Sequence, residues 1–149
     1  MRDQLNADGV VRVVVLDGDE VRAGLCSDLG FGMQDRIENS RRLAAVARLL
    51  VDAGLVVVVS AISPYRAARA QARAMFEPGT FWEVHVATPL STCMARDVKG
   101  LYGAARAGQL PQLTGVGATY EEPEAPDARL MGEGDVLVSV HAMLQLAGA

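Results

Sequence analysis

Three short runs of apolar residues predict three strands of a parallel sheet. They are Arg12–Leu16 (RVVVL), Leu55–Ser60 (LVVVVS) and Phe81–Ala87 (FWEVHVA). Continuous runs rich in β-branched residues are typical of strands that are buried on both faces in an α/β protein. His85 lies in the third run, where a structural role is the ordinary one for a histidine.

Apolar residues at helical spacing between the first two strands predict a long helix. The residues that share its buried face are Leu43, Val46, Ala47 and Leu50. Asp35 is the predicted N-cap, because a carboxylate accepts hydrogen bonds from the free N–H groups of a first turn. Gly54 is the predicted stop, because glycine readily takes the left-handed conformation that ends a helix.

Further helices are predicted on the C-terminal side of the second strand. One runs from about Pro64 to Met75 and is ended by the Glu-Pro-Gly sequence that follows, and the next starts near Pro89. The stretch GVGATYEEPEAPD reads as a surface loop, since it combines glycines, prolines and acidic residues. A final helix is predicted over 135–146.

The alternation of strands and helices indicates an α/β fold, with a three-layer parallel sheet flanked by helices. The 149 residues fit a single domain, 1–149, which is large enough to bury a core without metals or disulfides. Nothing near Cys26 or Cys93 has metal-ligand spacing, so we expect free thiols in a reducing cytosol.

Charge and hydropathy exclude two classes of partner. The net charge of -4 gives no general attraction for nucleic acid. The N-terminal residues MRDQLNADG lack an apolar signal segment, and the longest apolar run is far below membrane-spanning length. We therefore expect a cytoplasmic protein that binds neither nucleic acid nor membrane.

Polar segments follow each predicted strand, where doubly wound sheets bind their ligands. Directly after the first strand, Asp17 and Asp19 could hold a metal ion or take a proton, although an Asp-Gly turn with solvated acids explains them equally well. Farther along, Phe31 is followed by Arg36, Asn39 and Arg42 at three-residue spacing, which could bind a nucleotide or form a solvated helix face.

Two later segments have similar double interpretations. The turn SAISPYR points backbone N–H groups at the ligand crevice, but every α/β protein has such turns. The segment ARDVKGLYGAARAGQL contains Arg96, Lys99 and Arg106, which could cover phosphates as a lid or lie on a plain surface helix.

Taken together, these segments resemble the adenylylsulfate (APS) kinase family. Its members carry words like LDGDNVR, GLNxDLGFxxxDRxENxRR, SFISPxR, RDPKGLYxxARxG and FTGxxxPYExP. This chain reads LDGDEVR, GLCSDLGFGMQDRIENSRR, SAISPYR, RDVKGLYGAARAG and LTGVGATYEEP. The match runs from Val13 to about Pro126 and includes several uncommon words, so it is far more specific than any one motif.

The resemblance implies transfer of the γ-phosphoryl group of ATP to the 3'-hydroxyl of APS, giving the activated sulfate donor PAPS in sulfate assimilation. It implies ATP as co-substrate, Mg²⁺ as cofactor and a P-loop kinase-like fold. By position, Asp17 looks like the acidic residue beside the accepting hydroxyl, and Asp17 with Asp19 would contact the metal. A homodimer and association with an ATP sulfurylase are left open.

The resemblance also implies the substrate contacts. The APS pocket would be formed by Arg22, Phe31, Arg36, Asn39, Ile62 and Ser63, and the lid over the nucleotides by Lys99, Gly100 and Leu101. The arginines suit the phosphosulfate and the aromatic ring suits the adenine. Arg96 would lie beside the adenine of ATP.

One element of the family is missing from these 149 residues. Family members begin with a strand and a GxxGxGKST loop ahead of the stretch that corresponds to MRDQLNADG, and no such loop occurs here. That loop supplies the phosphate cradle, the lysine and the magnesium-binding hydroxyl. We therefore expect the family fold without its first strand and phosphate-binding loop.

Three functions compete on this basis. The first is an APS kinase whose start is not in the chain, and the second is a catalytically dead homologue that binds APS or a partner subunit. The third, a relative of shikimate or nucleoside kinases, would share the fold, but the DLGF and KGLY segments argue against it.

Overall fold

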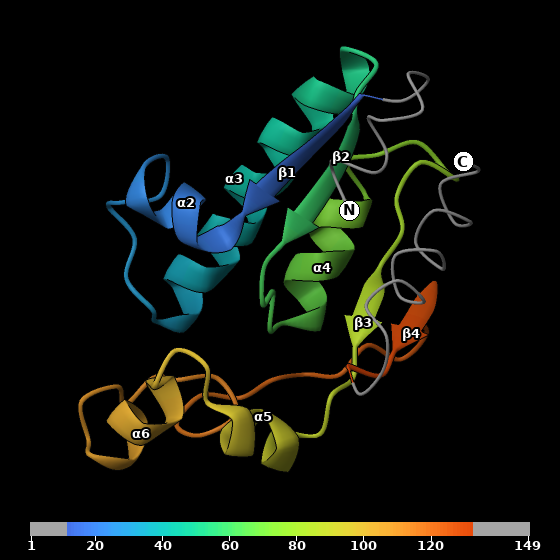
Figure 1. The fold of residues 1–149 in the computed structure, drawn as a ribbon. Helices are drawn as coiled ribbons and strands as arrows, with labels where there is room; N and C mark the ends of the chain where they lie inside the picture. Colours follow the sequence, from blue (N-terminus) through green and yellow to red (C-terminus); the bar gives the residue numbers. More distant parts are fainter. Residues whose placement is uncertain (1–11, 133–149) are drawn as a thin grey trace. The chain divides into compact units, whose positions relative to one another are not determined.

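The computed structural model describes residues 12–132, and contacts divide the chain into two compact units, Met1–Pro78 and Gly79–Ala149. The elements of the first unit are β1 (Val13–Asp17), α2 (Gly18–Ala23), α3 (Met33–Asp52), β2 (Val56–Ser60) and α4 (Arg66–Arg73) (Figure 1). Those of the second are β3 (Val84–Val86), α5 (Leu90–Arg96), α6 (Leu101–Arg106) and β4 (Ala128–Leu130). That the chain forms one domain stays a prediction.

In the first unit, β1 and β2 form a parallel pair whose register brings their carboxyl ends side by side. Val13 is opposite Val56 at one end of the ladder, and Asp17 is opposite Ser60 at the other. Helix α3 packs against both β2 and α4. The buried apolar residues of this unit are Val13, Cys26, Leu43, Ala44, Ala47, Tyr65 and Ala68. The α/β class and the parallel pairing predicted from the sequence are confirmed.

Helix α3 begins earlier than predicted. Gly32, in an extended conformation, is the N-cap, and its carbonyl accepts a hydrogen bond of 3.0 Å from the N–H of Arg36. The prediction of Asp35 as N-cap is therefore wrong; Asp35 lies in the first turn, where its charge still favours the positive end of the helix. The predicted stop is confirmed, since Gly54 follows the helix with φ of 82°.

Helix α4 starts two residues after Pro64, with Tyr65 as its N-cap in an extended conformation. The prediction of Pro64 in the first helical turn is wrong because the chain leaves β2 through a left-handed residue, Ser63, before it can turn into the helix. Helix α5 begins directly after Pro89, as predicted.

In the second unit, β3 and β4 form a parallel pair in which His85 is opposite Arg129. Strand β4 was not predicted, because three residues at the end of an acidic, proline-rich loop are too few to show the alternation of apolar and polar residues that indicates a strand. The predicted loop is confirmed, since residues 115–127 contain no helix or strand. The helix predicted over 135–146 lies outside the described residues.

The strands are less buried than their valine runs predict. Three of the five residues of β2 are half-buried and the last two, Val59 and Ser60, are exposed. In Figure 1, α3 and α4 lie behind the β1–β2 pair, so the described helices of this unit cover one face of it. No helix among the described residues is long and apolar enough to cross a membrane.

Candidate nucleotide site

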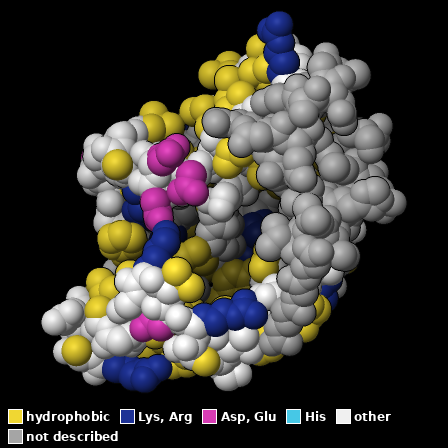
Figure 2. Space-filling view, viewed as in Figure 1, with side chains coloured by type: hydrophobic (Ala, Val, Ile, Leu, Met, Phe, Trp, Pro, Cys, Tyr) yellow, Lys and Arg dark blue, Asp and Glu magenta, His cyan; other side chains and the backbone are white. Residues whose placement is uncertain are grey.

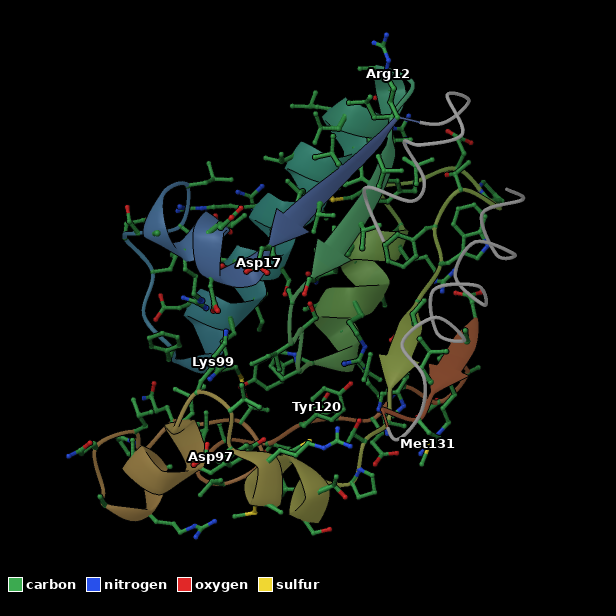
Figure 3. All side chains as sticks on the ribbon, viewed as in Figure 1. Arg12, Asp17, Asp97, Lys99, Tyr120 and Met131 are labelled. Atoms are coloured by element: carbon green, nitrogen blue, oxygen red, sulfur yellow. The ribbon has the colours of Figure 1, made fainter. Side chains whose placement is uncertain are left out.

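The carboxyl end of β1 presents a carboxylate held in a fixed position. Asp17, labelled in Figure 3, is the N-cap of α2. Its Oδ1 accepts a hydrogen bond of 2.8 Å from the N–H of Asp19. The next residue, Gly18, lies against the end of β2, since a Cβ atom there would be 3.0 Å from the carbonyl oxygen of Ser60. A side chain at this junction would push the two strand ends apart.

Two arginines converge on the aromatic ring of Phe31. Arg22 donates to the carbonyl of Gly30 at 2.9 Å, and its guanidinium carbon lies 4.6 Å from the centre of the Phe31 ring. Arg36 donates from Nε to the carbonyl of Phe31 at 2.8 Å, and its guanidinium carbon lies 5.7 Å from the same ring. Both arginines therefore stabilise the loop between α2 and α3, through hydrogen bonds to its carbonyls and cation–π contacts with its aromatic ring.

The cations of this cluster sit in a partly buried environment. Arg36 is 7% exposed. Burial lowers the pKa of its guanidinium below the ordinary value, and the nearby charge of Arg22 lowers it further. An anionic ligand would offset both effects, because it supplies opposite charge where water is excluded.

Asn39, one turn after Arg36 on α3, adds an unsatisfied polar atom. Its side chain is 7% exposed, and its Oδ1 has no hydrogen-bond partner within the described residues. A buried carbonyl oxygen without a partner costs about 1–3 kcal/mol, so such atoms are rare unless a ligand or water meets them. We call Arg22, Phe31, Arg36 and Asn39 the arginine–aromatic cluster.

The turn after β2 is strained. Ser63 has φ of 41°, in the left-handed region that residues other than glycine rarely occupy, at a cost of about 1–3 kcal/mol. Arg69 donates to the Ser63 carbonyl at 2.8 Å and holds the conformation. Two residues on, the buried Tyr65 is close enough to Arg36 to affect its pKa, so this turn approaches the cluster. Ile62, beside Ser63, is exposed.

The predicted lid residues belong to the second unit, where Asp97 organises them. Asp97 has φ of 31° and ends α5, while its carboxylate accepts from the N–H groups of Tyr102 and Gly103 at 3.0 and 2.9 Å. Gly100, with φ of 67°, completes the turn from α5 to α6. The connecting residues, including Lys99, are exposed (Figure 3). Arg96 donates to the carbonyl of Gly132 at 2.8 Å.

The predicted site residues thus fall into two groups. The first unit brings together Asp17 with the end of β2, and the four cluster residues with the turn around Ser63. Arg96, Lys99, Gly100 and Leu101 form their own group in the second unit. Surface apolar side chains are interspersed with charged ones (Figure 2), and in the first unit they include Phe31 at 56% exposure.

Sequence analysis missed three supporting residues. Tyr65 and Arg69 support the turn at Ser63, and Asp97 caps both helices of the second-unit group. A signal for Asp97 was available, because aspartate a few residues ahead of a helix is a favoured cap. Tyr65 and Arg69 act through tertiary contacts that no local pattern indicates.

The described residues contain no group of three His, Cys, Asp or Glu side chains that could hold a metal ion. Asp17 and Asp19 supply two carboxylates two residues apart in the sequence, and one oxygen of Asp17 already accepts a hydrogen bond from the N–H of Asp19. This limited donor set fits Mg²⁺, which usually takes only one or two carboxylates from a protein and the rest of its ligands from phosphates and water.

A carboxylate at the carboxyl end of a parallel strand marks the edge where open α/β sheets bind ligands, and the same unit holds a buried arginine, Arg36, against an exposed aromatic ring. The family model for adenylylsulphate kinase matches residues 1–131. The chain belongs to the adenylylsulphate kinase family.

Individual relatives agree with this assignment. The chain is 50% identical over 143 residues to the adenylyl-sulfate kinase of Shewanella halifaxensis, covering 95% of this chain and 70% of that one. Its fold is similar to the APS kinase of Mycobacterium tuberculosis solved with AMPPNP and APS. That match has a TM-score of 0.92 and 42% identity, over 99% of this chain and 86% of that one. A hexameric APS kinase from Thiobacillus denitrificans matches with a TM-score of 0.69 and 28% identity, over 99% of this chain and 24% of that one.

Proposed function

We propose that this chain transfers the γ-phosphoryl group of ATP to the 3'-hydroxyl of APS, giving PAPS. Membership of the family supports the reaction class. The observation that supports APS as the substrate is the arginine–aromatic cluster. In it, a buried cation and an unsatisfied buried oxygen lie on one face of α3 beside an exposed ring. These are the groups that a nucleotide with a phosphosulfate anion would satisfy.

Each cluster residue has a distinct part in binding APS. The Phe31 ring, exposed on the loop, offers a face for the adenine, while Arg22 and Arg36 supply charge to the phosphosulfate. Asn39 contributes an amide whose oxygen accepts a donor from the nucleotide. Ile62 and Ser63 would line the same pocket from the turn after β2.

Asp17 is the proposed catalytic residue. The hydrogen bond from the N–H of Asp19 fixes one carboxylate oxygen and leaves the other for the accepting 3'-hydroxyl, which it would orient and whose proton it would take late in the transfer. Mg²⁺ bound to the ATP phosphates would neutralise charge that develops during transfer, with Asp17 and Asp19 as its contacts on the protein. Lys99, Gly100 and Leu101 would close over the nucleotides, and Arg96 would lie beside the adenine of ATP.

The test is PAPS formation from ATP and APS by the chain and by Asp17→Asn. Losing a positioned acid or base typically costs about 10²–10⁴ in rate, so we expect a loss of at least a hundredfold in kcat with an unchanged melting temperature. Asp52→Asn is the matched control, because Asp52 is an exposed carboxylate that pairs with Arg48 at 2.8 Å. Equal and measurable turnover by Asp17→Asn and the wild type would remove Asp17 from the mechanism.

A second candidate function is APS binding without transfer. It is favoured by the arginine–aromatic cluster, which by itself supplies a cation, a ring and an unsatisfied oxygen for APS without any residue of the transfer step. Saturable APS binding by a folded chain that forms no PAPS would support this candidate. PAPS formation would exclude it.

We also propose a cytoplasmic location and self-association. One solved relative is described as hexameric, which supports an oligomer of this chain. Light scattering of the purified chain tests this, and a strictly monomeric mass at micromolar concentration would contradict it. Association with an ATP sulfurylase stays a prediction.

A further inference from the structure

Arg42 connects α3 to the loop that precedes this helix. It lies on α3, nearly two turns after Arg36. Its two terminal nitrogens donate to both carboxylate oxygens of Asp28, at 2.6 and 2.8 Å. The first of these nitrogens also donates to the carbonyl of Leu25 at 2.9 Å, and Nε donates to Glu38 at 2.9 Å. One guanidinium thus makes four hydrogen bonds to three residues, two of them in the loop.

The loop that Arg42 contacts carries the arginine–aromatic cluster. Residues 24–32 connect α2 to α3 without regular structure, and Phe31 stands near their end. The carbonyls of Gly30 and Phe31 are the acceptors that hold Arg22 and Arg36 beside the ring. A displacement of the loop would therefore move the ring and both cations together.

The first half of this loop is otherwise held by a buried side chain and by local backbone hydrogen bonds, among them Ser27 N–H to the Gly24 carbonyl and Leu29 N–H to the Cys26 carbonyl, both 3.1 Å. Cys26 is fully buried, and its N–H donates to the carbonyl of Val21 at 2.9 Å. The residues on either side, Leu25 and Ser27, are exposed. The Arg42 guanidinium links α3 to this half of the loop by side-chain hydrogen bonds to Leu25 and Asp28.

The charges of this connection are present at neutral pH. The hydrogen bond from Arg42 lowers the pKa of Asp28, and those from Arg41 and Arg42 lower the pKa of Glu38 to about 2. Both carboxylates are therefore ionised at any physiological pH. Charge-assisted bonds in a fork geometry fix orientation better than a lysine ammonium can.

We propose that Arg42 is a positioning residue for APS binding. It holds the loop so that Phe31, Arg22 and Arg36 take up their places before the nucleotide arrives. The inference rests on the proposed function for its ligand, and on the contacts of Arg42 for its mechanism. Pre-organisation of this kind raises affinity because the ordering cost is met before binding.

The chain offers a closely matched control. Arg41 precedes Arg42 on the same helix and forms a two-bond ion pair with the same carboxylate, Glu38, at 2.7 and 2.8 Å. Within the described part of the chain, its hydrogen bonds go to Glu38 and none to the loop. Arg41→Ala and Arg42→Ala therefore remove the same charge and a bond to the same partner, and differ in whether the loop is released.

Two measurements separate positioning from general stability. The first is hydrogen exchange of the amides of Cys26, Ser27 and Leu29 in the ligand-free protein, and the second is the APS dissociation constant. For Arg42→Ala we expect exchange at least tenfold faster in these amides and about tenfold weaker APS binding. Arg41→Ala should match the wild type in both. Asp28→Asn, which weakens the same link from an exposed side chain, should shift both in the direction of Arg42→Ala.

The outcomes distinguish the inference from the proposed function. If the wild type binds APS and Arg42→Ala binds it as tightly as Arg41→Ala, the inference is overturned and the proposed function stands. Unchanged loop exchange in both Arg42→Ala and Asp28→Asn would also overturn it. If the folded wild type binds no APS, the proposed function fails and the inference fails with it.

Discussion

Replacement of Asn39 by leucine should stabilise the ligand-free protein and weaken its binding of APS. Asn39 is 7% exposed and its Oδ1 lacks a partner within the described residues. An unsatisfied buried acceptor costs about 1–3 kcal/mol, and an apolar side chain of the same branching removes that cost. Allowing for imperfect packing of leucine, we expect a gain of about 1 kcal/mol, or a rise of about 2–4 °C in melting temperature.

The same change removes a hydrogen bond that the nucleotide would gain. A hydrogen bond contributes about 0.5–1.5 kcal/mol net, so the APS dissociation constant should rise by about three- to tenfold. Calorimetric melts and APS titrations measure the two effects. Ser40→Ala is the control: Ser40 is buried beside Asn39 but already donates to the Arg36 carbonyl at 3.0 Å, so its loss should lower the melting temperature and leave APS binding unchanged.

A lower melting temperature for Asn39→Leu would refute the claim that the oxygen is unsatisfied. Higher stability with unchanged APS affinity would show that the atom has no part in the pocket.

Three further changes test other parts of the structure. Gly18→Ala places a Cβ atom 3.0 Å from the Ser60 carbonyl oxygen. Thermal melts should therefore show lower stability, and the PAPS assay should show a reduced kcat. Wild-type values in both measurements would contradict the close approach of these two residues. Asp97→Ala removes the acceptor for the N–H groups of Tyr102 and Gly103, at a typical cost of about 1 kcal/mol, so these amides should exchange faster while those of α3 do not. The pKa of Glu38 is lowered from 4.5 to about 2, so its ion pairs stabilise the fold above pH 4.5 and are lost as the pH falls toward 2. The melting temperature of Glu38→Gln should accordingly lie below that of the wild type at pH 7 and converge with it at pH 2, and an equal gap at both pH values would contradict this assignment.

Local patterns predicted β1 and β2 closely because valine runs are unambiguous, whereas the predicted third strand, Phe81–Ala87, is longer than the observed β3, Val84–Val86. The predicted start of β1 differs from the observed one by one residue, and the predicted start of β2 likewise. They failed at the start of α3, where Gly32 supplies an extended cap ahead of the better N-cap former, Asp35. They also failed for β4, whose only reason to be a strand is its pairing with β3 more than forty residues earlier.

The site was predictable in composition and not in geometry. Resemblance to the family identified Arg22, Phe31 and Arg36, yet nothing in the sequence indicates that both guanidinium groups lie within 6 Å of one ring centre. The left-handed conformation of Ser63 and the unsatisfied oxygen of Asn39 are likewise products of tertiary packing. Both carry an energetic cost, and such costs are met in folded proteins where function requires them.

The most direct measurement is a calorimetric titration of APS into the chain, into Arg36→Ala and into Arg41→Ala. All three proteins are first checked by circular dichroism melts. We expect saturable binding by the wild type and by Arg41→Ala, and a loss of at least tenfold in affinity for Arg36→Ala. Equal affinity of all three proteins, or no saturable binding by the folded wild type, would contradict the assignment of the arginine–aromatic cluster as the APS site.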